Sequence, residues 1–231
     1  MAARRTATTT ALTREDLADA ALRLLEREGS KGLSMRKVAA EVGVQAASLY
    51  WHVQNKEELL DLAGDALWEG YVPLPPGRVP TPGDWRECVA IAARRLRTHL
   101  LAHASAVRVL AGRFAPGARA FGPLEETFGL LRRLGFGPSD TALASYTVMI
   151  WVQGFVLHEA VPMSAAEERG ATPAEAAALA RDRLVALPAE RYPHLVELAD
   201  ELTAPDMESR FEFGLARLLD GLETLRAAGP R

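Results

Sequence analysis

The sequence predicts an all-α protein with two domains. Apolar residues recur at helical spacing along most of the 231 residues, and no segment alternates as a β-strand would. Residues 72–83 are too rich in proline to continue a helix, so they divide the chain as a linker. We expect a three-helix helix-turn-helix domain over residues 13–71, a helical ligand-binding and dimerisation bundle over residues 84–231, and a disordered Thr-rich arm at residues 1–12.

Composition and charge restrict the partners of the chain. A content of 48% hydrophobic residues is enough for a sizeable core, and a formal charge of −3 excludes a global basic surface for nucleic acid. Residues 1–60 carry nine Lys or Arg against eight Asp or Glu, whereas the remainder carries eighteen against twenty-two. Any contact with nucleic acid should therefore be local and lie at the front of the chain.

The sequence also indicates a cytoplasmic protein with no membrane partner. Cys88 is the only cysteine, so no internal disulfide can form and a reducing compartment is favoured. The two arginines near the N-terminus are not followed by the apolar stretch of a secretory signal. Residues 143–161 are long and apolar, but polar groups interrupt them, and we interpret them as a buried helix. These groups are Ser145, Thr147, Gln153, His158 and Glu159.

Capping residues mark the first helices. Thr13 begins a helix with Asp16 three residues later, a capping box, and Gly29 ends it. Ser34 caps a second, short helix that runs to about Val42, and a third runs from about Gln45 to His52. A fourth helix follows Asn55, with Glu58 completing a second capping box and four apolar residues facing inward: Leu59, Leu60, Ala63 and Leu67.

The rest of the chain is predicted to be helical, with Gly and Pro between the helices. The candidates are about 84–103, 105–112, 121–134, 139–161, 173–187, 192–202 and 206–227. Residues 163–176 look like a mobile loop or a weak helix. The last helix repeats apolar residues at 4-3-4-3 spacing, a seam that needs a partner helix from the same chain or from a second copy. The seam consists of Phe211, Leu215, Leu218, Leu222 and Leu225.

The second and third helices have the features of a helix-turn-helix. They are short and meet at Gly43, which can supply the positive φ of a tight turn. If Leu49 points inward, a rotation of about 100° per residue turns the small residues and the rings outward. These are Ala47, Ser48, Tyr50 and Trp51. Such a face suits a helix in the major groove, with Arg36 and Lys56 holding the phosphates on either side.

At these residues the chain resembles the tetracycline-repressor (TetR) family. The stretch "GLSMRKVAAEVGVQAASLYWHVQNKEELLDL" (32–62) is close to the DNA-binding segment of the founding repressor. The resemblance is strong over residues 13–68 and continues to "FEFGLARLLDGLETL" (211–225), which is similar to the closing helix of the family's C-terminal domain. It implies a double-stranded DNA operator and contacts to it from Arg36, Ser48, Tyr50, Trp51, His52 and Lys56. We expect Gln45, Ala46 and Ala47 to contact the operator as well.

Two departures from the founding repressor concern the bases that are read. That repressor has Gln-Pro where this chain has Ala46 and Ala47, so its base-reading amide is missing at position 46. Met35 stands before Arg36, where the repressor has a hydroxyl residue. We therefore expect the same docking on a different operator sequence.

The resemblance also argues against a metal cofactor. In the tetracycline repressor a histidine and a glutamate organise a magnesium–drug complex, and these positions fall near Leu110 and Val161, which cannot bind a metal. The arginine that follows the histidine there falls near Phe114, next to Arg113. The remaining histidines lack the spacing of a metal site, because His99 and His103 lie one turn apart without a third ligand. A tetracycline–magnesium sensor is therefore not expected.

A small, largely apolar effector remains the expected ligand of the second domain. The candidate effector-binding residues are His99, Arg113, Phe114, Met149, Trp151, Gln153, Phe155 and His158. For the residues of the 143–161 helix, plain dimer core is the competing interpretation.

The sequence shows no phosphate-binding glycine loop, nucleophile elbow, paired-carboxylate signature or zinc signature, so no enzyme is predicted. We expect a homodimeric repressor that leaves a palindromic operator when its effector binds. The alternatives are an activator, a DNA-binding regulator that needs no ligand, and a helical small-molecule carrier.

Overall fold

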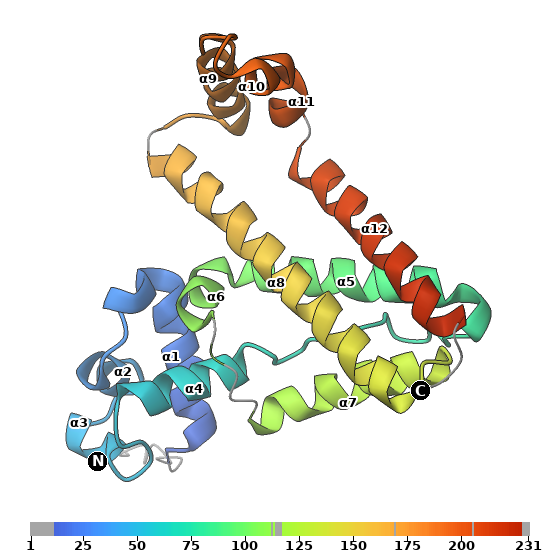
Figure 1. Ribbon diagram of the computed structural model, residues 1–231. Helices are drawn as coiled ribbons and strands as arrows, with labels where there is room; N and C mark the ends of the chain where they lie inside the picture. Colours follow the sequence, from blue (N-terminus) through green and yellow to red (C-terminus); the bar gives the residue numbers. More distant parts are fainter. Residues whose placement is uncertain (1–11, 112, 114–116, 169, 205, 228–231) are drawn as a thin grey trace, which may run out of the picture. The chain divides into compact units, whose positions relative to one another are not determined.

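The computed structural model describes residues 12–111, 113, 117–168, 170–204 and 206–227, with the backbone alone for 161–168 and 226–227 (Figure 1). These residues form helices joined by turns and contain no β-strand, which confirms the predicted all-α class. The predicted disordered arm lies almost entirely outside the described residues. No described helix is long and apolar enough to cross a membrane.

The chain divides into two compact units. The first comprises residues 1–71 and 105–124, and the second comprises residues 72–104 and 125–231. The sequence predicts a single division at residues 72–83, whereas in the structure residues 105–124 also belong to the first unit. Hydrogen bonds from this inserted segment to the first unit's own helices account for the difference, as described below.

The first unit is built on helices α1 (Arg14–Glu28) and α4 (Lys56–Ala66), which pack against each other (Figure 1). A short 3₁₀ turn (Gly29–Lys31), α2 (Met35–Glu41) and α3 (Ala46–Leu49) connect them. Helix α6 (Ala104–Leu110) and the start of α7 (Ala118–Arg133) belong to the inserted segment. The predicted inward residues of α4 are buried, and they meet buried α1 side chains, among them Leu17, Leu24 and Leu25. Each such leucine stabilises the fold by about 1.5–3 kcal/mol.

The predicted caps form at α1 and α2, and the cap at α4 differs in part. Thr13 and Asp16 make the capping box, and the Ser34 hydroxyl accepts from the amide of Lys37. Asn55 accepts a hydrogen bond from the amide of Glu58, but the predicted second box is wrong. The Glu58 carboxylate accepts from the Gln54 amide at 2.9 Å instead, one residue earlier in the chain.

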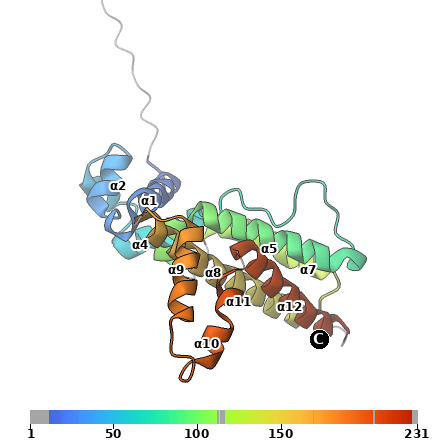
Figure 2. The ribbon, with the colours of Figure 1, turned by 90° about the horizontal axis from the view of Figure 1, so that it is seen from above.

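The second unit contains α5 (Trp85–Ala102), the end of α7, α8 (Pro138–Glu168) and α12 (Met207–Ala227). Between α8 and α12, the helices α9 (Pro173–Val185), α10 (Pro193–Glu197) and α11 (Ala199–Thr203) pack on one another (Figure 2). The single helix predicted over 192–202 is therefore two helices that meet at Leu198. Of residues 163–176, predicted to be a mobile loop or a weak helix, those up to Glu168 belong to α8 and those from Pro173 belong to α9.

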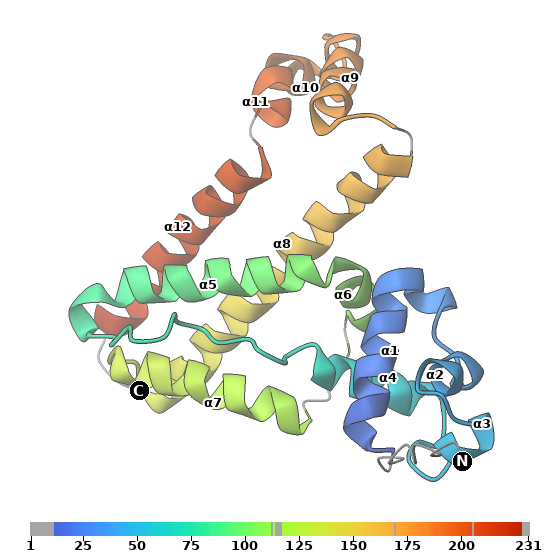
Figure 3. The same ribbon diagram turned by 180° about the vertical axis from the view of Figure 1, so that it is seen from behind.

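Helix α5 crosses both α8 and α12, which also touch each other (Figure 3). The α12 seam differs from the predicted one at two positions, because Leu218 and Leu225 are only half-buried. Phe211, Leu215 and Leu222 are buried as expected, but Leu219 is buried where Leu218 was predicted. Because Leu218 and Leu219 are adjacent, which of them is buried depends on the surfaces of α5 and α8 that α12 packs against.

Candidate nucleic-acid interface

The turn between α2 and α3 depends on the backbone conformation of Gly43. Its φ is +73°, a left-handed conformation that an L side chain adopts only with strain. A Cβ placed there would meet nothing within 4 Å, so the glycine is needed for its backbone freedom and not for space. The amide of Val44 then bonds to the carbonyl of Ala39 at 2.9 Å and closes the turn.

Helix α3 is held by Leu49 and presents its other side to solvent. Leu49 is 0% exposed, whereas Tyr50 is 59% and Trp51 is 90% exposed. Ala47 and Ser48 are exposed as well, as the helical rotation predicted, while Ala46 and His52 are half-buried. Trp51 is an unusually large apolar ring to leave in water, so this face has the character of a binding surface. Contact with DNA stays a prediction.

Arg14 supports the chain directly after α3, a role that the sequence did not suggest. Its guanidinium donates to the carbonyl of His52 at 2.5 Å and to Glu58 at 2.7 Å. The hydrogen bond from the Gln54 amide, followed by the one from the Arg14 guanidinium, lowers the pKa of the Glu58 carboxyl group. Arg14 stands at the first position of α1, where an arginine looks like an ordinary solvated residue.

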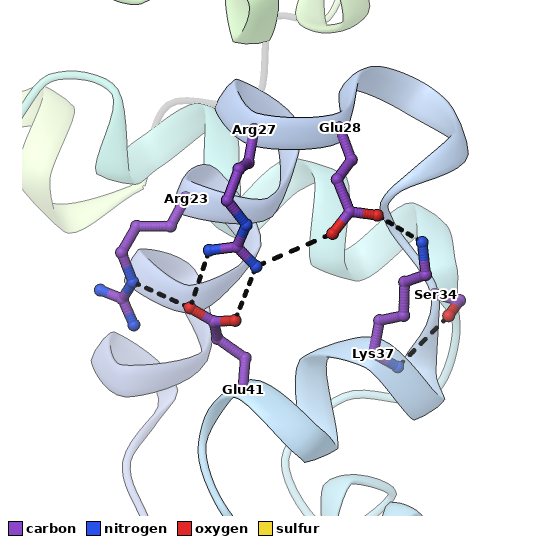
Figure 4. Close-up of polar contacts among 6 residues, drawn as sticks. All are labelled: Arg23, Arg27, Glu28, Ser34, Lys37 and Glu41. Atoms are coloured by element: carbon purple, nitrogen blue, oxygen red, sulfur yellow. Dashed lines mark hydrogen bonds and ion pairs between the residues drawn. The ribbon is translucent and has the colours of Figure 1, made fainter.

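A network of ion pairs fixes α2 against α1 (Figure 4). Glu41 accepts hydrogen bonds from Arg27 at 2.9 and 3.3 Å and from Arg23 at 3.5 Å. Glu28 binds the Lys37 ammonium at 2.5 Å. The hydrogen bond from Arg27 lowers the pKa of Glu41, and the one from Lys37 lowers the pKa of Glu28. The start of the helix-turn-helix is therefore braced by charge as well as by its apolar core.

The two cations expected beside α3 differ in their surroundings. Arg36 is exposed at the start of α2, and no hydrogen bond or ion pair of its side chain is seen within the described residues. The Lys56 ammonium donates to the carbonyl of Ser30 at 3.2 Å, although the residue is exposed. To bind a phosphate, the Lys56 ammonium must therefore break this hydrogen bond to Ser30 or keep it while donating a second one to the phosphate.

The segment 105–124 is bound to α4 through a stripe of acidic residues. Arg113 pairs with Asp61 at 2.7 Å and also with Glu57. The Asp65 carboxylate accepts from the amides of Arg119 and Ala120 at 3.3 and 3.0 Å, which caps the start of α7. Arg113, one of the effector candidates, thus has its guanidinium on α4. Phe114, another candidate, lies outside the described residues.

In the second unit, two effector candidates on α8 meet α12. The rings of Trp151 and Phe155 lie 4.9 and 5.2 Å from the ring of Phe211. Arg97 of α5 stacks over Phe211 at 4.5 Å and holds Glu159 through two hydrogen bonds of 2.8 and 3.0 Å. The sequence marked Glu159 only as a polar group in an apolar segment, and it did not indicate the pairing with Arg97, because the two residues are 62 positions apart.

The other candidates of this unit are not gathered with these rings. Met149 and Gln153 are half-buried on the opposite flank of α8, about 160° around the helix from Trp151 and Phe155. His158 is exposed, and the ring of His99 on α5 lies 5.2 Å from that of His103. Within the described residues, no three His, Cys, Asp or Glu side chains cluster as metal ligands would.

Two family models match the chain over most of its length. Residues 17–63 match the bacterial regulatory proteins of the tetR family, and residues 79–226 match the tetracyclin repressor-like C-terminal domain. The chain belongs to the TetR family. The first match contains the whole helix-turn-helix with its exposed face, and the second contains most of α5–α12.

Named relatives agree with this assignment. The TetR-family chain is 34% identical to the HTH-type transcriptional repressor DrrR1 of Streptomyces coeruleorubidus, over 94% of this chain and 79% of that protein. It is 35% identical to the class A tetracycline repressor from transposon 1721 in Escherichia coli, over 92% and 93% of the two chains. The solved structure of ActR from Streptomyces coelicolor in complex with actinorhodin superposes with a TM-score of 0.78 and 33% identity, over 94% and 99%.

This membership decides the class of activity. TetR-family proteins are transcriptional regulators that bind DNA through the helix-turn-helix and carry a C-terminal ligand-binding domain. The chain is accordingly a DNA-binding transcriptional regulator and not an enzyme.

Proposed function

We propose that the protein is a homodimeric repressor that binds a palindromic operator in the cytoplasm and releases it when a small, largely apolar effector binds. The observation that carries this proposal is the exposed α3 face, on which Trp51 is 90% exposed beside small side chains. Rings with polar tips can contact phosphate and sugar while the small residues let the helix approach the base edges. The proposed DNA contacts are the residues predicted from the sequence: Arg36, Gln45, Ala46, Ala47, Ser48, Tyr50, Trp51, His52 and Lys56.

The exposed stripe of α8 supports a dimer. Leu143, Tyr146 and Ile150 are 59%, 59% and 48% exposed and recur at three- and four-residue spacing. Such a row of large apolar side chains is expensive to leave in water and suits the same helix of a second copy. A two-fold dimer would place the two α3 helices on half-sites about 34–36 Å apart.

The relatives support a small-molecule effector. ActR is seen with actinorhodin, and a TetR variant from Acinetobacter baumannii, 28% identical with a TM-score of 0.62 over 94% and 99% of the two chains, is seen with minocycline. By analogy, the effector of this chain would meet candidate side chains of the second unit, namely His99, Met149, Trp151, Gln153, Phe155 and His158. Arg113 and Phe114 remain candidates from the sequence. A magnesium-bound drug is not proposed, because Leu110 and Val161 offer no metal ligand.

Coupling requires the effector to bind the two states of the dimer with different affinity. Residues 105–124 give a covalent route for this coupling, because they belong to the first unit and are flanked on both sides in the sequence by the second. A change in the effector-binding unit would then reach α4 through the bonds of Arg113 and Asp65.

The decisive experiment measures binding to the operator, with the operator chosen by selection from random duplexes. Tyr50→Ala and Lys56→Ala should lower operator affinity about 10-fold or more on every duplex and leave effector binding unchanged. Arg183→Ala, which removes an exposed cation of α9, is the matched control and should change neither. A carrier would select no duplex at all, and footprinting without protected sites would refute the proposal.

A reporter gene under the operator separates a repressor from an activator or a ligand-independent regulator. Deletion of the gene that encodes this protein should raise expression of the reporter. Effector added to the intact strain should also raise it. A decrease in reporter expression on deletion would favour the activator.

A further inference from the structure

Gln45 occupies an unusual position at the start of α3. It is the N-cap residue, yet its side chain makes no capping hydrogen bond. The N-cap residues of α1, α2 and α4 are Thr13, Ser34 and Asn55, and each accepts a backbone amide with its side chain. Glutamine is not among the residues that favour an N-cap. The residue at this position is therefore not explained by helix capping.

The Gln45 amide is available to another molecule. The side chain is exposed, and within the described part of the chain it has no hydrogen-bond partner. A free amide offers a donor and an acceptor side by side, the pair that matches N7 and N6 of adenine in the major groove.

The next two residues, Ala46 and Ala47, add only methyl groups. Ala47 is exposed and Ala46 is half-buried, so both present small apolar surfaces beside Gln45. The apolar group on a base edge that a methyl can recognise is the C5-methyl of thymine. Reading guanine normally takes an arginine or a lysine, and residues 45–48 contain neither.

We infer that Gln45, Ala46 and Ala47 determine operator specificity: Gln45 reads an adenine, and the two alanines read thymine methyl groups, at the core of each half-site. This inference rests on the proposed function, because it assumes that α3 lies in the major groove. It goes further by assigning the base pairs, which the resemblance leaves open.

The experiment is selection of duplexes from a random pool by the full-length protein and by its Gln45→Ala variant. The wild type should select A·T pairs at the core of both half-sites. Gln45→Ala should lose about 10- to 100-fold of the preference at one core position per half-site and keep the others. Gln54→Ala removes another exposed amide, just beyond α3, and should leave every preference intact.

Removing one methyl group from the DNA tests whether the alanines contact thymine. Uracil in place of the core thymine removes only the C5-methyl and should weaken binding of the wild type several-fold. Ala47→Gly should be less sensitive to the same replacement. The control is the melting temperature of each variant, which should equal that of the wild type if the fold is kept.

The outcomes separate the inference from the proposed function. A G·C core, or a Gln45→Ala variant with the wild-type preference at every position, would overturn the base assignment while leaving a DNA-binding repressor. Failure of the wild type to select any duplex would instead refute the proposed function.

Discussion

Arg97 and Glu159 form an ion pair that is almost removed from water. The two side chains are 10% and 9% exposed, and the guanidinium also meets Glu208 and the face of Phe211. Desolvation of both charges is costly, so the pair is weak evidence for added stability. Loss of Arg97 would leave the buried Glu159 carboxylate uncompensated, whereas loss of Glu159 would leave Arg97 with its exposed partner Glu208.

The substitution Arg97→Met should therefore destabilise the protein by about 3–5 kcal/mol. Glu159→Leu should cost less than Arg97→Met, because Glu208 still pairs with Arg97. The double variant should recover much of this loss, since apolar residues of similar size replace both charges. Chemical denaturation measures all three. Glu208→Gln is the control: its carboxylate is 65% exposed, and its loss should cost about 1 kcal/mol or less. Equal losses in the free energy of unfolding for Glu159→Leu and Glu208→Gln would contradict the claim that burial makes Glu159 the more important partner.

At the scale of elements, the contact between α1 and α2 should make the first unit sensitive to acid. Arg27 and Lys37 hold the pKa values of Glu41 and Glu28 below the ordinary value of about 4.3. A carboxyl group with a depressed pKa in the folded state contributes stability above its unfolded pKa, and this contribution is lost as the pH falls through the folded pKa. The loss should therefore begin near pH 4.3 and continue below it.

Glu41→Gln tests this expectation by removing the titrating group while keeping its shape. Thermal unfolding between pH 3 and pH 7 should show a smaller fall in melting temperature on acidification for the variant than for the wild type. At neutral pH the variant should be the less stable protein. Parallel curves for the two proteins would mean that the network does not contribute.

The cap of α7 joins two elements that are far apart in the sequence. A Cβ on Gly117 would overlap the Asp65 carboxylate, so glycine is what lets Asp65 reach the amides of α7. Asp65→Ala should destabilise the first unit by about 0.5–2 kcal/mol, as for other helix caps. Gly117→Ala should cost a similar amount, because the methyl group displaces the same carboxylate.

The two changes should not add in the double variant, since each removes the same cap. Asp61→Ala, one turn earlier on α4, is the matched control. It loses only its exposed pair with Arg113 and should cost about 1 kcal/mol or less. Additive losses for Asp65→Ala and Gly117→Ala would show that the cap is not what Gly117 protects.

These contacts show which features the sequence could predict. The caps at Thr13, Ser34 and Asn55 and the outward face of α3 depend on neighbours within four residues, so spacing alone predicts them. The Asp65 cap and the Arg97–Glu159 pair join residues 55 and 62 positions apart, and no local pattern marks them. Glu58 has the spacing of a capping box, but its carboxylate bonds Arg14 and the Gln54 amide, one residue before the predicted one.

At the scale of the whole molecule, the protein has few cations to offer a polyanion. Residues 12–71 contain seven Lys or Arg, and four of them are paired with carboxylates: Arg14 with Glu58, Arg23 and Arg27 with Glu41, and Lys37 with Glu28. Lys31, Arg36 and Lys56 have no carboxylate partner among the described residues. Nonspecific attraction to DNA should therefore be weak, which favours selection of the operator by its bases.

The salt dependence of operator binding measures this balance. Three phosphate contacts per protomer in a dimer predict a slope of log K against log salt of about −5. Glu28→Gln should free Lys37 for a further phosphate and steepen the slope by about 2 for the dimer. Glu201→Gln, an exposed carboxylate of α11, changes the net charge equally and should leave the slope unchanged.

Arg4 and Arg5 precede the described residues and carry charges of their own. Measuring the slope with and without residues 1–11 separates their part from that of the helix-turn-helix. A slope near −13 without these residues would mean that Arg14, Arg23, Arg27 and Lys37 leave their carboxylates on the operator. In that case the ion pairs between α1 and α2 would belong to the free protein alone, and DNA binding would compete with the contacts that brace the domain.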